Sequence, residues 1–128
     1  MRTSGILMPV FSLPSEYGIG CFSKEAYQFV DFLKESGQKN WQVLPLGQTS
    51  YGDSPYQSFS SFAGNPYFID LEQLVEQQLL TKEECDSLDF GKNPESIDYA
   101  KLYQNRYKIL RIACDRFLKQ PSDDFVSF

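Results

Sequence analysis

The sequence offers one candidate nucleophile, Ser54, in the triplet Gly52-Asp53-Ser54. Some serine hydrolases carry a Gly-Asp-Ser nucleophile early in the chain, but they usually continue with Leu, and here Pro55 follows. The GxSxG nucleophile-elbow pattern also fails, because Tyr56 occupies the position of its second Gly. The chain contains no histidine, so it supplies no imidazole base for a Ser-His-Asp or Cys-His site. The sequence therefore argues against an esterase.

The same stretch belongs to a segment whose residue types suit a sugar. A nearly continuous apolar run, residues 41–46, precedes a loop in which aromatic residues alternate with small polar ones. In parallel α/β architectures, ligands bind at the carboxyl ends of strands. Tyr can lie against the apolar face of a sugar while Asp, Ser and Gln bind its hydroxyls. The candidate binding residues are Tyr51, Asp53, Ser54, Tyr56 and Gln57. On spacing alone, it stays open whether Tyr56 and Asp53 only hold the loop in shape.

The composition argues against two classes of partner. The 128 residues carry a formal net charge of −5 and no run of Lys or Arg, so neither a nucleic acid nor an anionic membrane surface is an expected partner. No apolar stretch is long enough to span a bilayer. The apolar run at residues 6–11 is too short for the core of a signal peptide and contains Pro9. These features predict a cytoplasmic protein.

The cysteines do not form a pattern that holds a metal or a disulfide framework. Cys21, Cys85 and Cys114 are odd in number, widely spaced and without a CxxC pair. The absence of histidine also removes the commonest ligand of catalytic zinc. We therefore expect three free thiols, no metal site and no cofactor.

The first half of the chain has the pattern of a βαβ unit. A strand is expected within residues 4–13, short or bent at Pro9, and a second strand over residues 40–46, buried on both faces. Between them, apolar residues at helical spacing predict a helix over residues 24–36, with Ser23 as its N-cap and Gly37 as its stop.

Residues 47–66 are rich in Gly, Pro and Ser but also in aromatic residues, which predicts a long ordered loop. Beyond it, the pattern becomes mostly helical. Thr81 and Glu84 form a capping box at the start of one short helix, and Pro121 ends a longer one. The expected elements are a strand at residues 67–71, short helices at 71–77 and 81–87, a long helix at 97–119 and the opening of another helix at 123–128.

Residues 51–66 are similar, nearly residue for residue, to a signature stretch of the amylomaltase (disproportionating enzyme) family of 4-alpha-glucanotransferases. The similarity extends to Trp41-Gln42-Val43-Leu44-Pro45-Leu46-Gly47 and to Phe68-Ile69-Asp70-Leu71-Glu72. The opening residues 4–20 also resemble the start of that family's sequence. The resemblance is close to about residue 75 and looser afterwards. It predicts that the chain is an N-terminal fragment of such an enzyme.

The resemblance implies an α/β fold, the N-terminal part of a (β/α)8 TIM barrel. Such a barrel needs roughly 250 residues, so the barrel is incomplete in this chain and the missing C-terminal part of the same polypeptide is an expected partner. Residues 1–66 are assigned to the first β/α units, with the substrate-binding loop at 47–66. Residues 67–128 are assigned to a mostly helical inserted subdomain, truncated at its C-terminus.

The resemblance also implies an activity, the transfer of alpha-1,4-glucan segments between maltooligosaccharides by a retaining double displacement. The nucleophile Asp and the acid/base Glu of that mechanism are expected downstream, so no catalytic residue is expected in this chain. We do not assign Asp53 or Asp70 to those roles, and we expect Asp70 to be structural.

The resemblance gives each binding candidate a role. Tyr56 matches the tyrosine that packs against the sugar next to the scissile bond, Ser54 a residue of the same turn, and Tyr51 an aromatic of an outer glucan contact. Asp53 and Gln57 match positions that shape the loop or bind hydroxyls.

Two positions depart from the family pattern. Cys21 stands where Asp is common and Gln48 where Pro is common. Neither belongs to the proposed sugar contacts, although the role of position 21 is put in doubt. The alternative hypothesis from a different class is a stand-alone glucan-binding module without catalysis.

Overall fold

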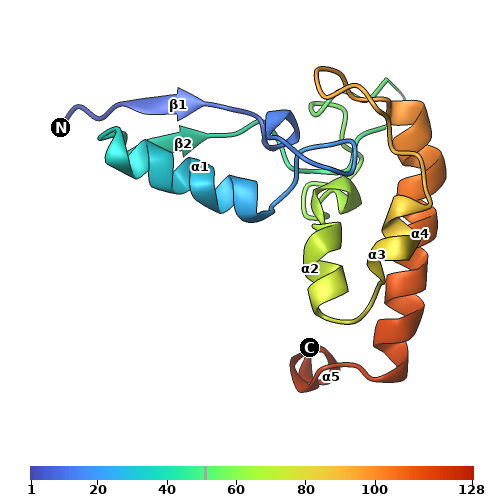
Figure 1. The fold of residues 1–128 in the computed structure, drawn as a ribbon. Helices are drawn as coiled ribbons and strands as arrows, with labels where there is room; N and C mark the ends of the chain where they lie inside the picture. The colour runs from blue at the N-terminus through green and yellow to red at the C-terminus, as the bar shows by residue number, and fades with distance from the viewer. Residues whose placement is uncertain (51) are drawn as a thin grey trace.

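The computed structural model describes residues 1–50 and 52–128. Its N-terminal third is the expected βαβ unit (Figure 1). Strands β1 (Gly5–Leu7) and β2 (Asn40–Gln42) pair in parallel, with Ile6 opposite Trp41, and helix α1 (Lys24–Glu35) connects them. The prediction of a parallel βαβ unit is therefore confirmed.

Both strands are shorter than the apolar pattern predicted. The first prediction, residues 4–13, is interrupted at Pro9, and a 3-10 turn, η1 (Val10–Ser12), follows that proline. The second prediction, residues 40–46, overran the observed strand by four residues, because the chain leaves the regular strand before Pro45. Proline lacks the N–H that a ladder hydrogen bond requires, which accounts for the interruption of the first segment and is consistent with the early end of the second.

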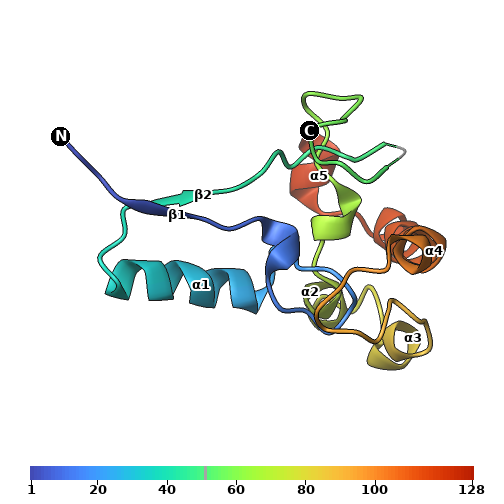
Figure 2. The same cartoon turned by 90° about the horizontal axis from the view of Figure 1, so that it is seen from above.

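The strands are also more exposed than predicted. All three residues of β1 are exposed, and in β2 only Trp41 is partly covered. The Trp41 indole N–H donates to the Met8 carbonyl at 2.8 Å, and its ring meets Phe29 of α1 edge to face at 5.1 Å between centroids. Helix α1 thus covers one face of the pair (Figure 2). The expectation that the second strand is buried on both faces is wrong for this chain.

The two ends of α1 are formed by different means. Ser23 occupies the N-cap position with an extended backbone, but its hydroxyl donates to the Glu25 carboxylate and caps no backbone N–H. The sequence prediction was therefore right about the position and wrong about the hydrogen bond. At the other end, Gly37 has φ +73°, and the next amide, of Gln38, donates back to the Leu33 carbonyl at 2.9 Å. A left-handed residue with such a bond is a common helix stop.

No strand forms at residues 67–71, and that prediction is wrong. A 3-10 turn, η2 (Pro66–Phe68), begins there, and the side chain of Asn65 accepts a hydrogen bond from the Tyr67 N–H at 3.0 Å. Helix α2 (Leu71–Glu76) follows at once, capped by Asp70, whose carboxylate accepts from the Glu72 N–H at 3.0 Å. Because caps bracket this short apolar run, the backbone turns instead of extending.

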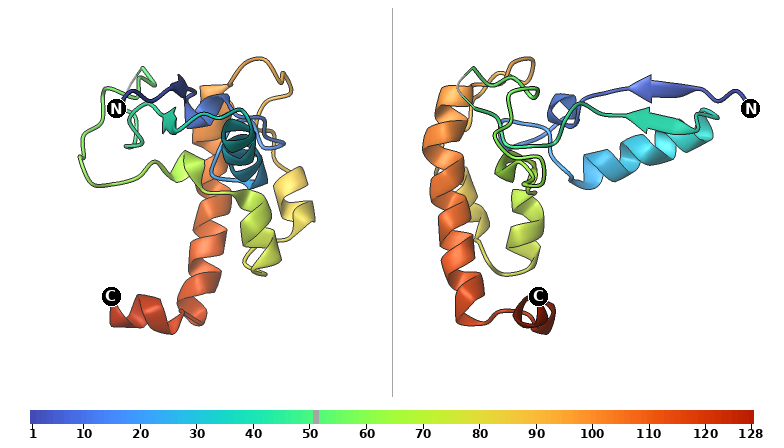
Figure 3. Two further views of the ribbon diagram at one scale, coloured as in Figure 1. Left: turned by 90° about the vertical axis from the view of Figure 1, so that its left-hand side faces the viewer. Right: turned by 180° about the vertical axis from the view of Figure 1, so that it is seen from behind.

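The remaining helices follow the sequence prediction closely. Helix α3 (Lys82–Asp86) begins with the Thr81–Glu84 capping box, and α5 (Asp123–Ser127) forms at the end of the chain. The long helix α4 (Tyr99–Lys119) starts two residues later than predicted, because the Asp98 carboxylate caps it through the Lys101 N–H at 3.1 Å. Figure 3 shows α4 along the side of the helical part, with α5 folded back at its lower end.

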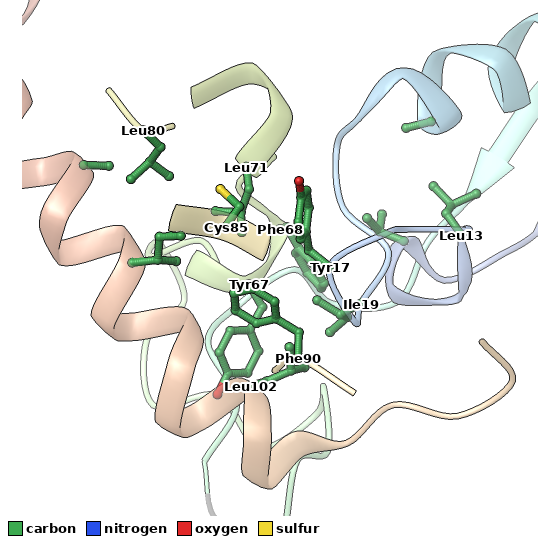
Figure 4. Close-up of a cluster of buried hydrophobic side chains, with 14 residues drawn as sticks. Leu13, Tyr17, Ile19, Tyr67, Phe68, Leu71, Leu80, Cys85, Phe90 and Leu102 are labelled. Carbon is green, nitrogen blue, oxygen red and sulfur yellow. The ribbon is translucent and has the colours of Figure 1, made fainter. Parts of the chain in front are cut away.

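The core lies where the helices meet residues 10–26 (Figure 4). Leu71, Leu102 and Ile109 are completely buried there, and the Tyr17 ring meets Phe90 edge to face at 5.9 Å. One charged side chain, Arg106 of α4, is also fully buried within this cluster. The core therefore joins the start of the chain to α2, α3 and α4.

Candidate functional site

Residues 47–66, here called the aromatic loop, follow the end of β2 and run into the first residue of η2. In the described residues of this loop, 47–50 and 52–66, two sides touch through antiparallel bridges that join Gly47 to Gly64 and Thr49 to Ser58. A Cβ on Gly47 would stand 2.5 Å from the Ser58 hydroxyl oxygen, so any larger residue would force Ser58 to shift. The described part of the predicted loop is therefore folded back on itself.

Two turns shape the tip of the aromatic loop. Gly52 and Asp53 both have positive φ angles, +101° and +57°, and the Asp53 N–H donates to the Ser50 carbonyl at 3.1 Å. In the second turn, the Gln57 N–H donates to the Ser54 carbonyl at 3.1 Å, with Pro55 at the position that proline favours. Left-handed backbone is tolerated by Gly and, among other residues, by Asp and Asn, which explains the residue types of the first turn.

The predicted sugar-binding residues divide between two sides of this tip. Tyr56 points outward, with 72% of its surface exposed, and Gln57 beside it is also exposed. Ser54 is half-buried, and its hydroxyl accepts from the Tyr56 N–H at 3.4 Å, so it supports the turn that presents Tyr56. Tyr51 lies outside the described residues.

Asp53 lies on the inner side of the loop. It is half-buried and borders a narrow gap with Asn65, Phe68 and Tyr99. Burial raises the pKa of Tyr99, and the negative charge of Asp53 adds to the effect. Burial first, then the neighbouring tyrosines and Asp53, raise the pKa of Tyr67 to about 12. This placement favours a loop-shaping role for Asp53 over direct contact with a ligand.

Tyr56 borders a hollow of about 460 Å³. The segment after β2, Pro45 to Gly47, and the returning side of the aromatic loop also line this hollow. Phe62, which is fully exposed, is among the lining residues together with three serines. The hollow therefore combines aromatic faces with hydroxyl groups, the chemistry expected for a sugar.

The sequence prediction missed Phe62 as a member of this site. Its signal was present, because Phe62 is one of the aromatic residues within the loop. Residue type and spacing do not tell which of these rings face the hollow. Which rings face the hollow depends on how the two sides of the loop pack together.

The other acidic candidate, Asp70, is structural, as expected. Its carboxylate caps α2, and burial raises its pKa although the backbone hydrogen bonds to it oppose the effect. Across residues 1–50 and 52–128, no group of three His, Cys, Asp or Glu side chains is placed to hold a metal ion. In the same residues, every helix is too short or too polar to cross a bilayer.

The sequence model of the 4-alpha-glucanotransferase family matches residues 8–128. The chain belongs to that family. The resemblance recognised in the aromatic loop and its neighbours is thereby confirmed, and the match continues through the helical part to residue 128. A 4-alpha-glucanotransferase of Clostridium butyricum is 54% identical over 121 residues, and one of Thermus thermophilus is 46% identical over 123 residues.

The fold of this 4-alpha-glucanotransferase family member also matches a solved structure. The amylomaltase from Streptococcus agalactiae, determined in complex with acarbose, superposes with a TM-score of 0.90 at 50% sequence identity. The superposition covers 94% of this chain and 24% of that one. The Clostridium and Thermus proteins are covered over 25% and 24% of their lengths. The chain thus spans about a quarter of the length of these relatives.

Proposed function

We propose that the full-length polypeptide carrying this chain is a 4-alpha-glucanotransferase that moves alpha-1,4-glucan segments from one maltooligosaccharide to the 4-hydroxyl of another. The observation that carries the proposal is the family match over residues 8–128, which includes the whole aromatic loop. The shape of that loop supports it, because an exposed tyrosine lines a hollow together with serine hydroxyls.

In this reaction a C1–O4 bond of the donor breaks and a C1–O4 bond to the acceptor forms. The acceptor hydroxyl loses its proton, and the leaving 4-oxygen gains one. With retention, the two displacements require a carboxylate nucleophile and a carboxylic acid that alternates as acid and base. We place both groups outside residues 1–128. The role of this chain is to bind and orient the donor sugar.

Tyr56 is the principal residue in that role. Its ring is free to lie against a pyranose face, and Gln57 and Ser54 are close enough in sequence to bind hydroxyls at its side. Asp53 fixes the turn from within. Tyr51 keeps its assignment to an outer glucan contact, on the family resemblance alone.

The exposed strands fit a larger architecture. We assign residues 1–66 to the first β/α units of a (β/α)8 barrel and residues 67–128 to a helical subdomain inserted into it. In such a barrel every strand has neighbours on both sides, which agrees with the exposed sides of β1 and β2 in this chain. We further propose that the protein is cytoplasmic. Its partners are maltooligosaccharides, and the reaction needs no cofactor.

The alternative of a stand-alone glucan-binding module is less well supported. The Clostridium, Thermus and Streptococcus agalactiae proteins are all about four times as long as the matched segment, and each bears the name of a glucanotransferase or amylomaltase. Nothing comparable supports a module that acts alone.

The test is Tyr56→Ala in the full-length enzyme, assayed for glucan transfer with maltotriose. We expect kcat/KM to fall about tenfold or more, because the lost contact between the sugar and the tyrosine ring contributes on the order of 1 kcal/mol and misplacement of the donor costs further rate. The melting temperature should not change, since Tyr56 is exposed.

The matched control is Tyr27→Ala on α1, where the tyrosine is 74% exposed. It should leave transfer unchanged. Unchanged turnover of maltotriose in Tyr56→Ala would remove Tyr56 from the donor site.

A further inference from the structure

Helix α4 contacts the aromatic loop near the first residue of the loop. The side-chain amide of Gln48 donates to the Tyr107 hydroxyl at 2.8 Å, across 59 positions of sequence. Both side chains are half-buried, so water competes weakly for this bond. The Tyr107 ring in turn lies 5.6 Å from the ring of Tyr67, the second residue of η2, just past the end of the loop.

The neighbouring residue, Arg106, holds the chain where it leaves the loop. Its guanidinium donates to the carbonyls of Tyr67 at 3.0 Å and Ile69 at 2.6 Å, and also to that of Tyr17 at 3.2 Å. The Phe90 ring lies 6.0 Å from the guanidinium carbon. A planar group with several donors spread over a fixed fork can join three carbonyls of two backbone segments in this way, whereas the donors of a lysine all lie on one atom.

Two adjacent residues of α4 therefore fasten both ends of the aromatic loop. Gln48 is held near the start, and the carbonyls of Tyr67 and Ile69 are held beyond the end. Between these points the loop makes few backbone hydrogen bonds to the rest of the chain, and its tip carries Tyr56. A loop fixed at its base loses less conformational freedom when it binds a ligand.

We propose that Tyr107 is a positioning residue, which through Gln48 keeps the aromatic loop in the conformation that presents Tyr56 to the donor sugar, while Arg106 fixes the loop's far end. The inference rests on the proposed glucan-transfer function. Tyr107 itself packs between Tyr67 and Tyr103 and does not line the hollow that Tyr56 borders. It acts on substrate only through the loop.

The test is Tyr107→Phe in the full-length enzyme, which removes one hydroxyl and keeps the ring packing. We expect the KM for maltotriose to rise about three- to tenfold with little change in kcat, because the loop must be ordered again on each binding event. Gln48→Ala should give the same KM, and the double variant no more than either single variant, since all three lose one bond.

Tyr103→Phe is the matched control. Tyr103 lies one turn earlier on α4, 71% exposed, with its ring 5.8 Å from that of Tyr107. It should change neither KM nor kcat. The second measurement is amide hydrogen exchange without glucan. Exchange should accelerate within residues 47–66 in Tyr107→Phe and stay at the wild-type rate in Tyr103→Phe.

The outcomes separate this inference from the proposed function. If Tyr56→Ala impairs transfer while Tyr107→Phe changes neither KM nor loop exchange, the positioning role is wrong and the function stands. A fall in kcat and melting temperature without a change in KM would also overturn it, as the effect would be structural. If Tyr56→Ala leaves transfer intact, Tyr56 has no part in donor binding and the positioning role fails with it. If the full-length wild-type enzyme transfers no glucan, the proposed function fails, and loop exchange alone decides whether Tyr107 orders the loop.

Discussion

The strands and the helices of this chain differ in how fully they are covered. In the βαβ layer, made of β1, α1 and β2, both strands are largely exposed, and α1 carries the exposed side chains of Tyr27, Val30 and Phe32. In the helical part, made of α2, α3 and α4, Leu71, Leu102 and Ile109 are completely buried. The two regions have similarly strong local sequence patterns, so the difference lies in what packs on them.

This contrast shows where the fold is complete within these residues. The helical part buries Leu71, Leu102 and Ile109 against residues 10–26, so its apolar faces have partners. The βαβ layer has apolar strand residues that no other described segment covers, such as Leu7 at 54% exposure. An exposed pair of strands is normally covered in a stable protein. We therefore expect the layer to be less stable in residues 1–128 alone than in the full-length polypeptide.

The largest expected effect tests this contrast directly, through Leu102→Ala and Leu7→Ala. Leu102 is completely buried on α4, and its truncation should lower the free energy of unfolding by roughly 2–5 kcal/mol in any context. In residues 1–128 alone, Leu7→Ala should cost less than about 1 kcal/mol, because Leu7 is half exposed. The measurement is urea unfolding of both variants.

The same two variants, Leu102→Ala and Leu7→Ala, should also be compared in the full-length polypeptide. If further strands cover β1 there, the cost of Leu7→Ala should rise toward that of Leu102→Ala. An equally small cost in both contexts would mean that β1 stays exposed and that its assignment to a closed barrel is wrong.

The helical part could be predicted from the sequence better than the strands, for a physical reason. Helix limits depend on local signals, and Thr81 and Gly37 act at the helix ends where the sequence placed them. Asp98 was not predicted as a cap, but it also sets the start of α4 by a local hydrogen bond. Strand length depends on partners, which a local pattern does not show. The mistaken strand at residues 67–71 came from a short apolar run, which is ambiguous by periodicity alone. The flanking caps Asn65 and Asp70 were the signal that could have corrected it.

The candidate site was predictable to a similar degree. The loop and its outward Tyr56 followed from residue types and the family resemblance. Three placements did not follow from the sequence, because each depends on contacts between distant segments. They are Asp53 on the inner side of the loop, Phe62 at the hollow, and the Gln48 side chain against Tyr107. Arg106 was missed for the same reason. A charged residue on a helix is usually exposed, and only the three carbonyls around it permit its burial.

A smaller effect is expected from glycines of the two regions. Gly18 has φ +85°, and a Cβ there would stand 2.2 Å from the Phe90 carbonyl oxygen, where the start of the chain meets the helical part. Gly18→Ala should cost roughly 2–4 kcal/mol, since strain and overpacking add. Gly37, at the end of α1, has φ +73° with nothing within 4 Å of the added Cβ. Gly37→Ala should cost about 1–2 kcal/mol.

Thermal unfolding of the two glycine variants measures the difference. Equal losses would show that backbone strain alone matters and that the contact between Gly18 and Phe90 is not tight. A loss confined to Gly37→Ala would contradict the expected order, because neither the positive φ angle of Gly18 nor its approach to Phe90 would then cost stability.

The smallest expected effect is the acid sensitivity of the helical part. The Arg116 guanidinium binds both oxygens of the Glu84 carboxylate, at 2.6 and 2.8 Å, and with the Thr81 N–H it lowers the pKa of Glu84 to about 2. A carboxylate whose pKa is lower in the folded state stabilises the protein above its unfolded-state pKa, which is about 4.3. That contribution should disappear as the pH falls from about 4.5 toward 2.

Urea midpoints measured between pH 7 and pH 2 test this. In Glu84→Gln, which keeps a capping oxygen but no charge, the midpoint should be lower at pH 7 and should fall less steeply below pH 4.5 than in the wild type. Glu83→Gln is the control, an exposed carboxylate in the same first turn of α3. If Glu84→Gln and Glu83→Gln show the same pH dependence, the ion pair between α3 and α4 adds nothing to the helical part. Burial of apolar side chains alone would then hold α3 against α4, because exposed ion pairs are often energetically neutral.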